Sequence, residues 1–149
     1  MAQPETAAST DLDEQLCFSL YAASRAMTGC YRPQLDAIGL TYPQYLVMIV
    51  LWEQDGITVS DIGARLFLDS ATLTPLLKRM EQAELITRQR AASDERQVIV
   101  TLTPAGSALR EQARSIGGDL LCATACDLPT VIKLKEQVVA LRDNLMKNS

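Results

Sequence analysis

The sequence predicts a mainly α-helical protein with one small β-hairpin. Apolar residues recur at helical spacing in several segments, beginning with Leu12, Leu16 and Leu20. Two short helical patterns in the middle of the chain are joined by a turn of only a few residues. Two β-prone runs follow, on either side of the polar loop 91–96. At 149 residues the chain is long enough for one domain whose core needs neither disulfides nor metal.

The first third of the chain predicts a sequence of three helices. They are expected at about Thr10–Tyr31, after Pro33 as far as Gly39, and over Tyr42–Gln54. Thr10-x-x-Asp13 supplies an N-cap and an acidic first turn for the first helix. Thr41-x-x-Gln44 is a capping box that opens the third helix, and Asp55-Gly56 ends it.

Two more helices are predicted in the middle of the chain, over Ser60–Leu66 and Ser70–Ala83. Ser60 is the expected N-cap of the first, and Asp69 or Ser70 caps the second. Their apolar residues recur so that each helix has one inner face. Two helices of this length joined by so tight a turn are typical of the helix-turn-helix motif.

The β-prone runs Leu85–Arg90 and Gln97–Leu102 predict a hairpin with one face toward solvent. Arg88 and Arg90 lie at period two on the first run, so both side chains are expected on the same face. Thr103-Pro104 then supplies an N-cap and an N1 proline for a helix that is expected to reach Cys126.

The last predicted helix, about Thr130–Lys147, follows a break at Asp127-Leu128-Pro129. Its apolar residues form a heptad seam: Val131, Leu134, Val138, Leu141 and Leu145. A domain of this size does not need so long an apolar stripe for its own core. We therefore infer that the terminal helices, together with the first helix, build a dimer interface. The alternative is that the seam packs within one chain.

The distribution of charge permits DNA binding, although the net charge is −4. Four of the 18 acidic residues lie within the first 15 positions, so the rest of the chain is neutral. Several basic residues also gather in the short stretch between Lys78 and Arg96.

Composition excludes several kinds of site. The chain has no histidine, which removes Ser–His and Cys–His nucleophile pairs and His-containing zinc sites. Its four cysteines lack the paired C-x-x-C spacing of a zinc site, so we expect no metal and no cofactor. No apolar run approaches the ~18 residues of a membrane span, and the N-terminus lacks a secretory signal. We expect a cytoplasmic protein, with no membrane partner, whose cysteines rest as thiols.

A helix-turn-helix followed by a charged hairpin, with helices on both flanks, resembles the winged helix-turn-helix repressors of the multiple antibiotic resistance regulator (MarR) family. AELITRQRAASDERQVIVTLTPAG resembles the wing of this family, including the Asp-x-Arg signature at Asp94 and Arg96. The polar, Ala-rich residues 1–10 are expected to form a flexible tail, and the resemblance implies a single domain over residues 11–149. Within this domain we expect the winged helix-turn-helix at about 41–103 and dimerisation helices at about 11–40 and 104–149.

LDSATLTPLLKRME resembles the recognition helix of one MarR subgroup, the organic hydroperoxide resistance regulators. This subgroup carries a cysteine in its first helix followed by two tyrosines, matched here by Cys17, Tyr31 and Tyr42. The resemblance implies a homodimeric repressor, not an enzyme, that releases operator DNA when organic hydroperoxide oxidises this thiol. In the two-cysteine branch a resolving thiol captures the oxidised cysteine across the dimer, and Cys122 matches that thiol. Cys126, one helical turn later on nearly the same face, is the alternative.

The chemistry of a peroxide sensor sets requirements for Cys17. Only a thiolate attacks a peroxide, and a free cysteine with a pKa of ~8.5 is mostly protonated at neutral pH. Cys17 is expected about two turns into its helix, where the helix dipole has little effect, so tyrosine hydroxyls remain as thiolate-stabilising donors. Tyr31 lies 14 residues further on, which is ~21 Å along a continuous helix. The two side chains can therefore meet only where the first helices of two subunits cross.

DNA contacts are predicted on the second helix of the helix-turn-helix and on the wing. Ser70, Thr72 and Thr74 are candidates for bases or phosphates, and Lys78 and Arg79 for phosphates. Arg96 at the wing tip is placed for the minor groove, with Asp94 orienting it. Arg88 and Arg90 are further candidates, although charges on a solvent-facing hairpin need no function.

Two other functions stay open from the sequence. The first is a MarR-type repressor that is released by a non-covalent aromatic or phenolic ligand. The second is a thiol peroxidase, which the recognition helix and wing argue against because an enzyme has no use for them. For Cys17 itself the simpler interpretation is an apolar core filler, and Cys30 is interpreted as structural.

Overall fold

The computed structural model describes residues 10–149, so the expected flexible tail lies outside the described residues except for Thr10. The chain divides into two compact units. Residues 32–116 form one, which we call the central unit. The segments that end at Tyr31 and begin at Gly117 form the other, which we call the flanking unit.

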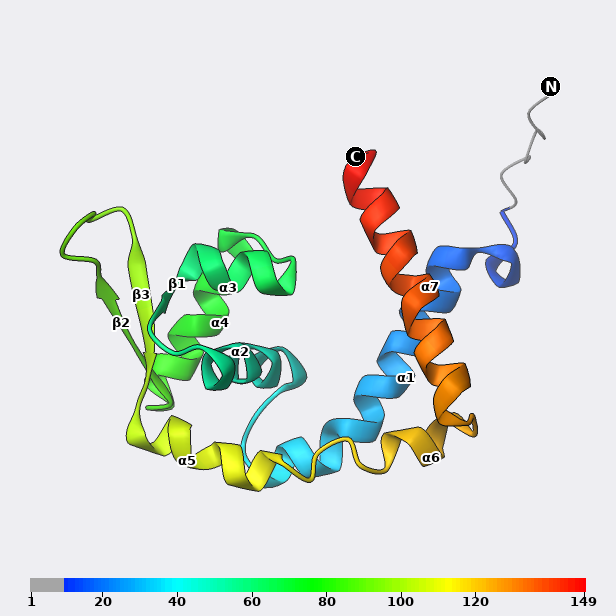
Figure 1. Ribbon diagram of the computed structural model, residues 1–149, viewed down its shortest axis with the longest axis horizontal. Helices are drawn as coiled ribbons and strands as arrows, with labels where there is room; N and C mark the ends of the chain where they lie inside the picture. Colours follow the sequence, from blue (N-terminus) through cyan, green and yellow to red (C-terminus); the bar gives the residue numbers. More distant parts are fainter. Residues whose placement is uncertain (1–9) are drawn as a thin grey trace. The chain divides into compact units, whose positions relative to one another are not determined.

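The central unit is a helix-turn-helix with a three-stranded sheet, drawn from cyan to yellow in Figure 1. Its elements are α2 (Tyr42–Glu53), β1 (Ile57–Thr58), α3 (Val59–Leu66), α4 (Ser70–Gln82), β2 (Ile86–Arg90), β3 (Val98–Leu102) and α5 (Pro104–Ala113). The predicted mainly α-helical fold with a small β-hairpin wing is confirmed. The sequence did not predict β1, which has two residues and pairs with β3 in the strand order β1-β3-β2.

The flanking unit consists of helical segments. Its elements are the short 3-10 helix η1 (Leu12–Glu14), the larger part of α1 (Leu16–Ala37), α6 (Leu120–Thr124) and α7 (Leu128–Lys147). The last residues of α1 belong to the central unit. Among the described residues, no single helix is long and apolar enough to cross a membrane, and only α1 and α2 as a bent pair meet the length and composition of a span.

A dry core holds the helices of the central unit against one face of its sheet. The largest fully buried side chains are Val47, Met48 and Leu51 of α2, Ile62 of α3, Leu73, Leu77 and Met80 of α4, Ile86 of β2 and Val100 of β3. The wing register is antiparallel, with Ile86 opposite Leu102 and Arg90 opposite Val98. At the edge of this core, the Trp52 indole Nε1 donates to the Gly106 carbonyl at 3.0 Å and ties α2 to α5.

The turn between α3 and α4 depends on one glycine. A Cβ atom on Gly63 would lie 2.6 Å from the Leu68 carbonyl oxygen, so a larger residue would push the turn open. Phe67, the C-cap of α3, has φ 57°, in the left-handed region. The prediction that Ser60 caps α3 is wrong, because Thr58 forms the capping box with Asp61. For α4, the Asp69 side chain is the cap.

Three predicted helix boundaries differ from the structure. The first helix begins at Leu16 rather than at Thr10, because η1 and its C-cap Gln15 precede it. The predicted break at Pro33 is wrong: α1 continues to Ala37 with Pro33 inside it, although an interior proline removes a backbone donor and crowds the preceding turn. The helix expected from Pro104 to Cys126 ends at Ala113, and Gly117 with φ 86° lies in the turns before α6.

The flanking unit leaves its apolar side chains uncovered. None of its described residues is buried. Its large apolar side chains with more than a third of their surface exposed are Leu12, Leu16, Tyr21, Met27, Leu121, Leu128, Ile132, Leu134, Val138, Leu145 and Met146. Exposed apolar surface on this scale is typical of a protein–protein interface.

The junction of α5 with the end of α4 predicts a strong effect at Gly106. A Cβ atom there would lie 2.2 Å from the Leu85 carbonyl oxygen, which is backbone and cannot move aside. Gly106→Ala is expected to lower the free energy of unfolding by about 2–3 kcal/mol, as in other overpacked sites. Ser107→Ala, an exposed neighbour, should change it by no more than about 0.5 kcal/mol. Urea unfolding at fixed protein concentration measures both, and equal effects would contradict the close approach.

Candidate nucleic-acid interface and thiol sites

The start of α4 presents a row of hydroxyl and basic side chains to solvent. Leu73, Leu77 and Met80 turn into the core. The opposite side of the helix leaves the predicted DNA-contacting residues exposed: Ser70, Thr72, Thr74, Lys78 and Arg79. Leu73, Leu77 and Met80 are spaced by four and three residues, so they share one face of the helix.

The N-terminus of α4 is fixed by Asp69. The Thr72 backbone N–H donates to Asp69 Oδ1 at 2.8 Å. This hydrogen bond stabilises the carboxylate and lowers the pKa of Asp69 from its ordinary value of 3.8. The cap therefore holds an ionised carboxylate at neutral pH, beside the hydroxyls of Ser70 and Thr72.

Hydrogen bonds fix the tip of the wing. Asp94 Oδ1 accepts from the Arg96 backbone N–H at 3.0 Å and from Arg96 Nε at 3.2 Å. The Arg96 side chain is nevertheless 92% exposed, so its guanidinium is oriented but not covered. Arg90 Nη1 donates to the Glu95 carbonyl at 3.0 Å, within the same loop. The geometry thus brings Asp94 and Arg96 together at the tip, with Arg90 at its base.

Arg88 lies apart from the other wing arginines. It is half-buried, and its Nη2 donates to Glu81 Oε1 at 3.2 Å, while its backbone N–H donates to Glu81 Oε2 at 3.0 Å. The side-chain hydrogen bond from Arg88 lowers the pKa of Glu81 from its ordinary value of 4.5. This pair connects β2 to the end of α4.

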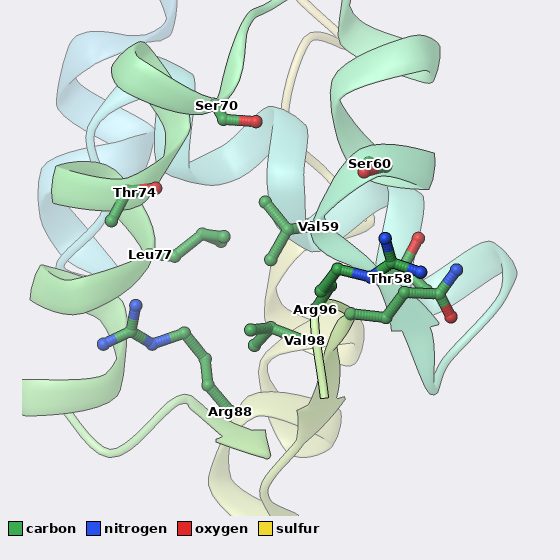
Figure 2. A pocket seen from close by; sticks show the side chains of 10 residues that line it. Thr58, Val59, Ser60, Ser70, Thr74, Leu77, Arg88, Arg96 and Val98 are labelled. Carbon is green, nitrogen blue, oxygen red and sulfur yellow. The ribbon is translucent and has the colours of Figure 1, made fainter. Parts of the chain in front are cut away.

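A groove of about 230 Å³ runs between α4, the start of α3 and the wing. Figure 2 shows Ser70 and Thr74 on one side of it, Thr58 and Ser60 on the other, and Arg88 and Arg96 on the wing. Apolar side chains, including Leu77 and Val98, form the rest of its lining. The sequence did not identify Thr58 or Ser60 as site residues. The available signal was the Thr58-x-x-Asp61 capping-box pattern, which places the N-cap of α3 two residues before Ser60.

The four cysteine thiols are exposed and unbonded to one another. Cys17 is the second residue of α1, not two turns into a helix as predicted. Its side chain therefore lies in the first turn of α1. Cys30 Sγ approaches the Ala26 carbonyl at 3.4 Å on the same helix. Both are exposed in the chain, so neither is an apolar filler of the chain's own core.

The proposed resolving thiols lie around the end of α6. Cys122 is inside this helix, and the Ala125 N–H donates to its carbonyl at 3.1 Å. Cys126 follows the left-handed residue Ala125 and precedes Asp127, the N-cap of α7. The expectation that both thiols lie on nearly the same helical face is wrong, because α6 ends at Thr124, between them.

The tyrosines divide between the two units. Tyr31, in the flanking unit, packs on Gly117, where an added Cβ would lie 3.0 Å from Tyr31 Cε1. Tyr42 belongs to the central unit, where its ring lies 6.3 Å from that of Tyr45. Cys17 and Tyr31 occupy the same unbroken helix, so one chain holds them ~21 Å apart along its axis.

Comparison with known proteins gives the family. Residues 30–113 match the family model described as transcriptional regulator SarA/Rot. An organic hydroperoxide resistance transcriptional regulator of Bacillus subtilis is 48% identical over 90% of this chain and 91% of its own length. The chain belongs to the MarR family of transcriptional regulators. Within it, this regulator falls among the organic hydroperoxide resistance regulators.

Solved structures agree with this placement of the regulator. Reduced AbfR bound to DNA is 40% identical, with a TM-score of 0.72, and the match covers 90% of this chain and 95% of AbfR. AbfR is a protein of Staphylococcus epidermidis. Its disulfide form is also 40% identical, with a TM-score of 0.60 and coverage of 87% and 91%.

The lowered pKa of Asp69 predicts a pH dependence of stability. A depressed folded-state pKa adds stability that is present above the unfolded value of 3.8 and is lost as the pH falls through the folded-state value. Asp69→Asn keeps an N-cap acceptor but does not titrate. At pH 7 the regulator should therefore be more stable than this variant, and the difference should shrink below pH 3.8.

Thermal unfolding from pH 7 down to the acid limit of the native state measures this difference. Asp69→Ala, which removes the cap, serves as the comparison and should be less stable than Asp69→Asn throughout. A gap between wild type and Asp69→Asn that stays constant with pH would show that the charge of Asp69 does not contribute.

Proposed function

We propose that the regulator is a homodimeric repressor that binds operator DNA when reduced and is released when organic hydroperoxide oxidises Cys17. The observation that carries this proposal is the position of Cys17 and Tyr31 on one continuous helix, in a chain 48% identical to an organic hydroperoxide resistance regulator. Because the Cys17 thiol and the Tyr31 hydroxyl cannot meet within one chain, we expect the thiol of one subunit to meet the hydroxyl of the other.

The uncovered surface of the flanking unit supports the homodimer. Leu134, Val138 and Leu145 of the predicted heptad seam are 57%, 41% and 61% exposed in the single chain. A second copy of the same helices would cover this seam in a two-fold arrangement, in which each side contributes the same residues. The other two seam residues, Val131 and Leu141, are partly covered within the chain, so packing within one chain covers only part of the seam.

The thiol site is proposed to be shared between subunits. In it Cys17 would face the partner subunit's Tyr31 and the partner subunit's Tyr42, whose hydroxyls would donate to the thiolate. The first-turn position of Cys17 adds the field of the α1 dipole in the same direction. No lysine or histidine is needed for this activation.

The proposed chemistry has two balanced steps. The Cys17 thiolate attacks the outer oxygen of the hydroperoxide, the O–O bond breaks, and sulfenic acid and an alkoxide form. The alkoxide takes a proton and leaves as the alcohol. The partner subunit's Cys122 thiol then displaces the sulfenic hydroxyl as water, giving an intersubunit disulfide. Cellular thiols would reduce it again.

Exposure of the recognition helix and wing supports operator binding. Ser70, Thr72, Thr74, Lys78 and Arg79 would enter the major groove or contact its phosphates, and Arg96 would reach the minor groove beside Asp94. Arg90 is a further candidate for a phosphate. AbfR has been solved bound to DNA in its reduced form, and a separate structure shows its disulfide form. An intersubunit disulfide would re-pack the dimer helices as rigid bodies and change the spacing of the two recognition helices.

A second candidate is release by a non-covalent aromatic ligand, which one groove favours. This groove, of about 290 Å³, lies between α2 and α5 in the central unit. Its lining includes Tyr45, Trp52, Arg110 and Arg114, which suit an aromatic anion. In this case oxidation of Cys17 would not be required for release.

Release of DNA by hydroperoxide separates the two candidates. Reduced wild type bound to a duplex selected from a random pool should dissociate on addition of cumene hydroperoxide, with at least a tenfold loss of affinity, in a gel-shift or anisotropy assay. Cys17→Ser should bind the duplex normally and stay bound, because serine does not form a sulfenic acid. Cys30→Ser is the matched control and should respond as wild type. Release of Cys17→Ser by hydroperoxide would contradict the thiol mechanism.

Non-reducing electrophoresis identifies the resolving thiol. Hydroperoxide should convert wild type to a disulfide-linked dimer, and Cys122→Ser should abolish that band while Cys126→Ser retains it. A band that survives Cys122→Ser and is lost in Cys126→Ser would reassign the resolving role to Cys126.

A further inference from the structure

We propose that the groove between α4, α3 and the wing seats one phosphate of the DNA backbone, and that Glu81 is a positioning residue for Arg88 in this site. The inference rests on the proposed DNA binding. It goes further because it places a backbone phosphate of the DNA in this groove and gives the Glu81 carboxylate a role in positioning Arg88.

The lining of the groove has the chemistry of a phosphate site. Two arginines of the wing, Arg88 and Arg96, are among its lining residues, and Figure 2 shows Arg88 on the α4 side of the groove and Arg96 near Thr58. Hydroxyl groups face it from two helices: Ser70 and Thr74 on α4, and Thr58 and Ser60 at the start of α3. None of its ten lining residues is acidic. A phosphodiester oxygen accepts hydrogen bonds and carries negative charge, so it matches both kinds of group.

Arg88 is held in place before any ligand arrives. Its side chain is only 24% exposed, and its Nη2 and backbone N–H both donate to Glu81. Its Nε is buried and has no acceptor in the described part of the chain. Of the guanidinium nitrogens, only Nη2 donates to Glu81 among the described contacts, so the group retains hydrogen-bonding capacity that this carboxylate does not meet.

Glu81 fixes the wing to the recognition helix at the groove. It belongs to the last turn of α4, and its carboxylate accepts hydrogen bonds from both the backbone N–H and the side chain of Arg88 in β2. Because the Arg88 hydrogen bond lowers the pKa of Glu81, the carboxylate is ionised at neutral pH. A long side chain that is already ordered loses less conformational entropy when it binds a phosphate, so Glu81 should strengthen DNA binding despite its negative charge.

A second arginine–glutamate pair, Arg65 with Glu53, serves as a matched control for the Arg88–Glu81 pair. Arg65 Nη2 lies 2.7 Å from Glu53 Oε2 and joins α3 to α2 in the same unit. Neither residue lines the groove. Arg65→Ala and Glu53→Gln therefore make the same chemical changes as Arg88→Ala and Glu81→Gln, away from the proposed phosphate.

The test measures the affinity of the reduced full-length protein for duplex DNA between low and moderate salt. Loss of one phosphate contact reduces the slope of log affinity against log salt by about one. Arg88→Ala should show this reduction, with the same fold loss on a selected duplex and on an unrelated one. Glu81→Gln should weaken binding about two- to tenfold, the effect of leaving one long side chain unordered. Arg65→Ala and Glu53→Gln should match wild type in slope.

Two results would overturn the site. The first is an unchanged salt slope in Arg88→Ala. If this variant does not fold, Arg88→Gln replaces it in the test, because glutamine keeps amide donors for Glu81. The second is tighter binding by Glu81→Gln, the outcome of simple charge removal without positioning. If wild type binds no duplex, the DNA-binding function fails and this inference with it. Normal wild-type binding with either result above overturns only the phosphate site.

Discussion

Helix α1 runs unbroken from Leu16 to Ala37, and its continuity keeps Cys17 and Tyr31 of one chain at separate places along its length. The same helix belongs to a unit whose described residues include none that is buried. Both features have the same consequence. The described part of the flanking unit has no core of its own, and in our proposal a second copy supplies that core and brings the thiol and the hydroxyl together. Assembly and chemical sensing would then depend on one interface.

The central unit behaves as a contrasting, self-sufficient block. Its core is dry, and two glycines, Gly63 and Gly106, sit where backbone atoms of neighbouring segments approach too closely for a side chain. The Trp52 hydrogen bond and the Arg88–Glu81 pair join helices to one another and to the wing. We propose that this unit moves as one body, so that a change at the proposed dimer helices would alter the distance between recognition helices without changing either of them.

Local signals predicted most of the central unit, because turn lengths, β-prone runs and one of its capping boxes can be recognised in short stretches of sequence. The box at Thr41 and the hairpin near Arg88 are examples. The Thr58 box of α3 and strand β1 were missed. Errors arose where a local rule was overridden: Pro33 is tolerated inside α1, and the helix after Pro104 ends early. The Glu81–Arg88 pair joins two elements, so helix and strand periodicity gave no sign of it. The residue types of the thiol site were recognised by resemblance, but the first-turn position of Cys17 required the structure.

Mixed dimers test the intersubunit account most directly. Two kinds of subunit are combined and treated with cumene hydroperoxide: one carries Cys17→Ser and the other Cys122→Ser. In both, serine also replaces Cys30 and Cys126, and the two carry tags of different length. Neither homodimer can form the proposed disulfide, but the mixed dimer has one intact pair across its interface. The account predicts a cross-linked band at the mixed size alone on a non-reducing gel. No cross-link in the mixture, with an intrachain disulfide in the parent that carries both Cys17 and Cys122, would contradict it.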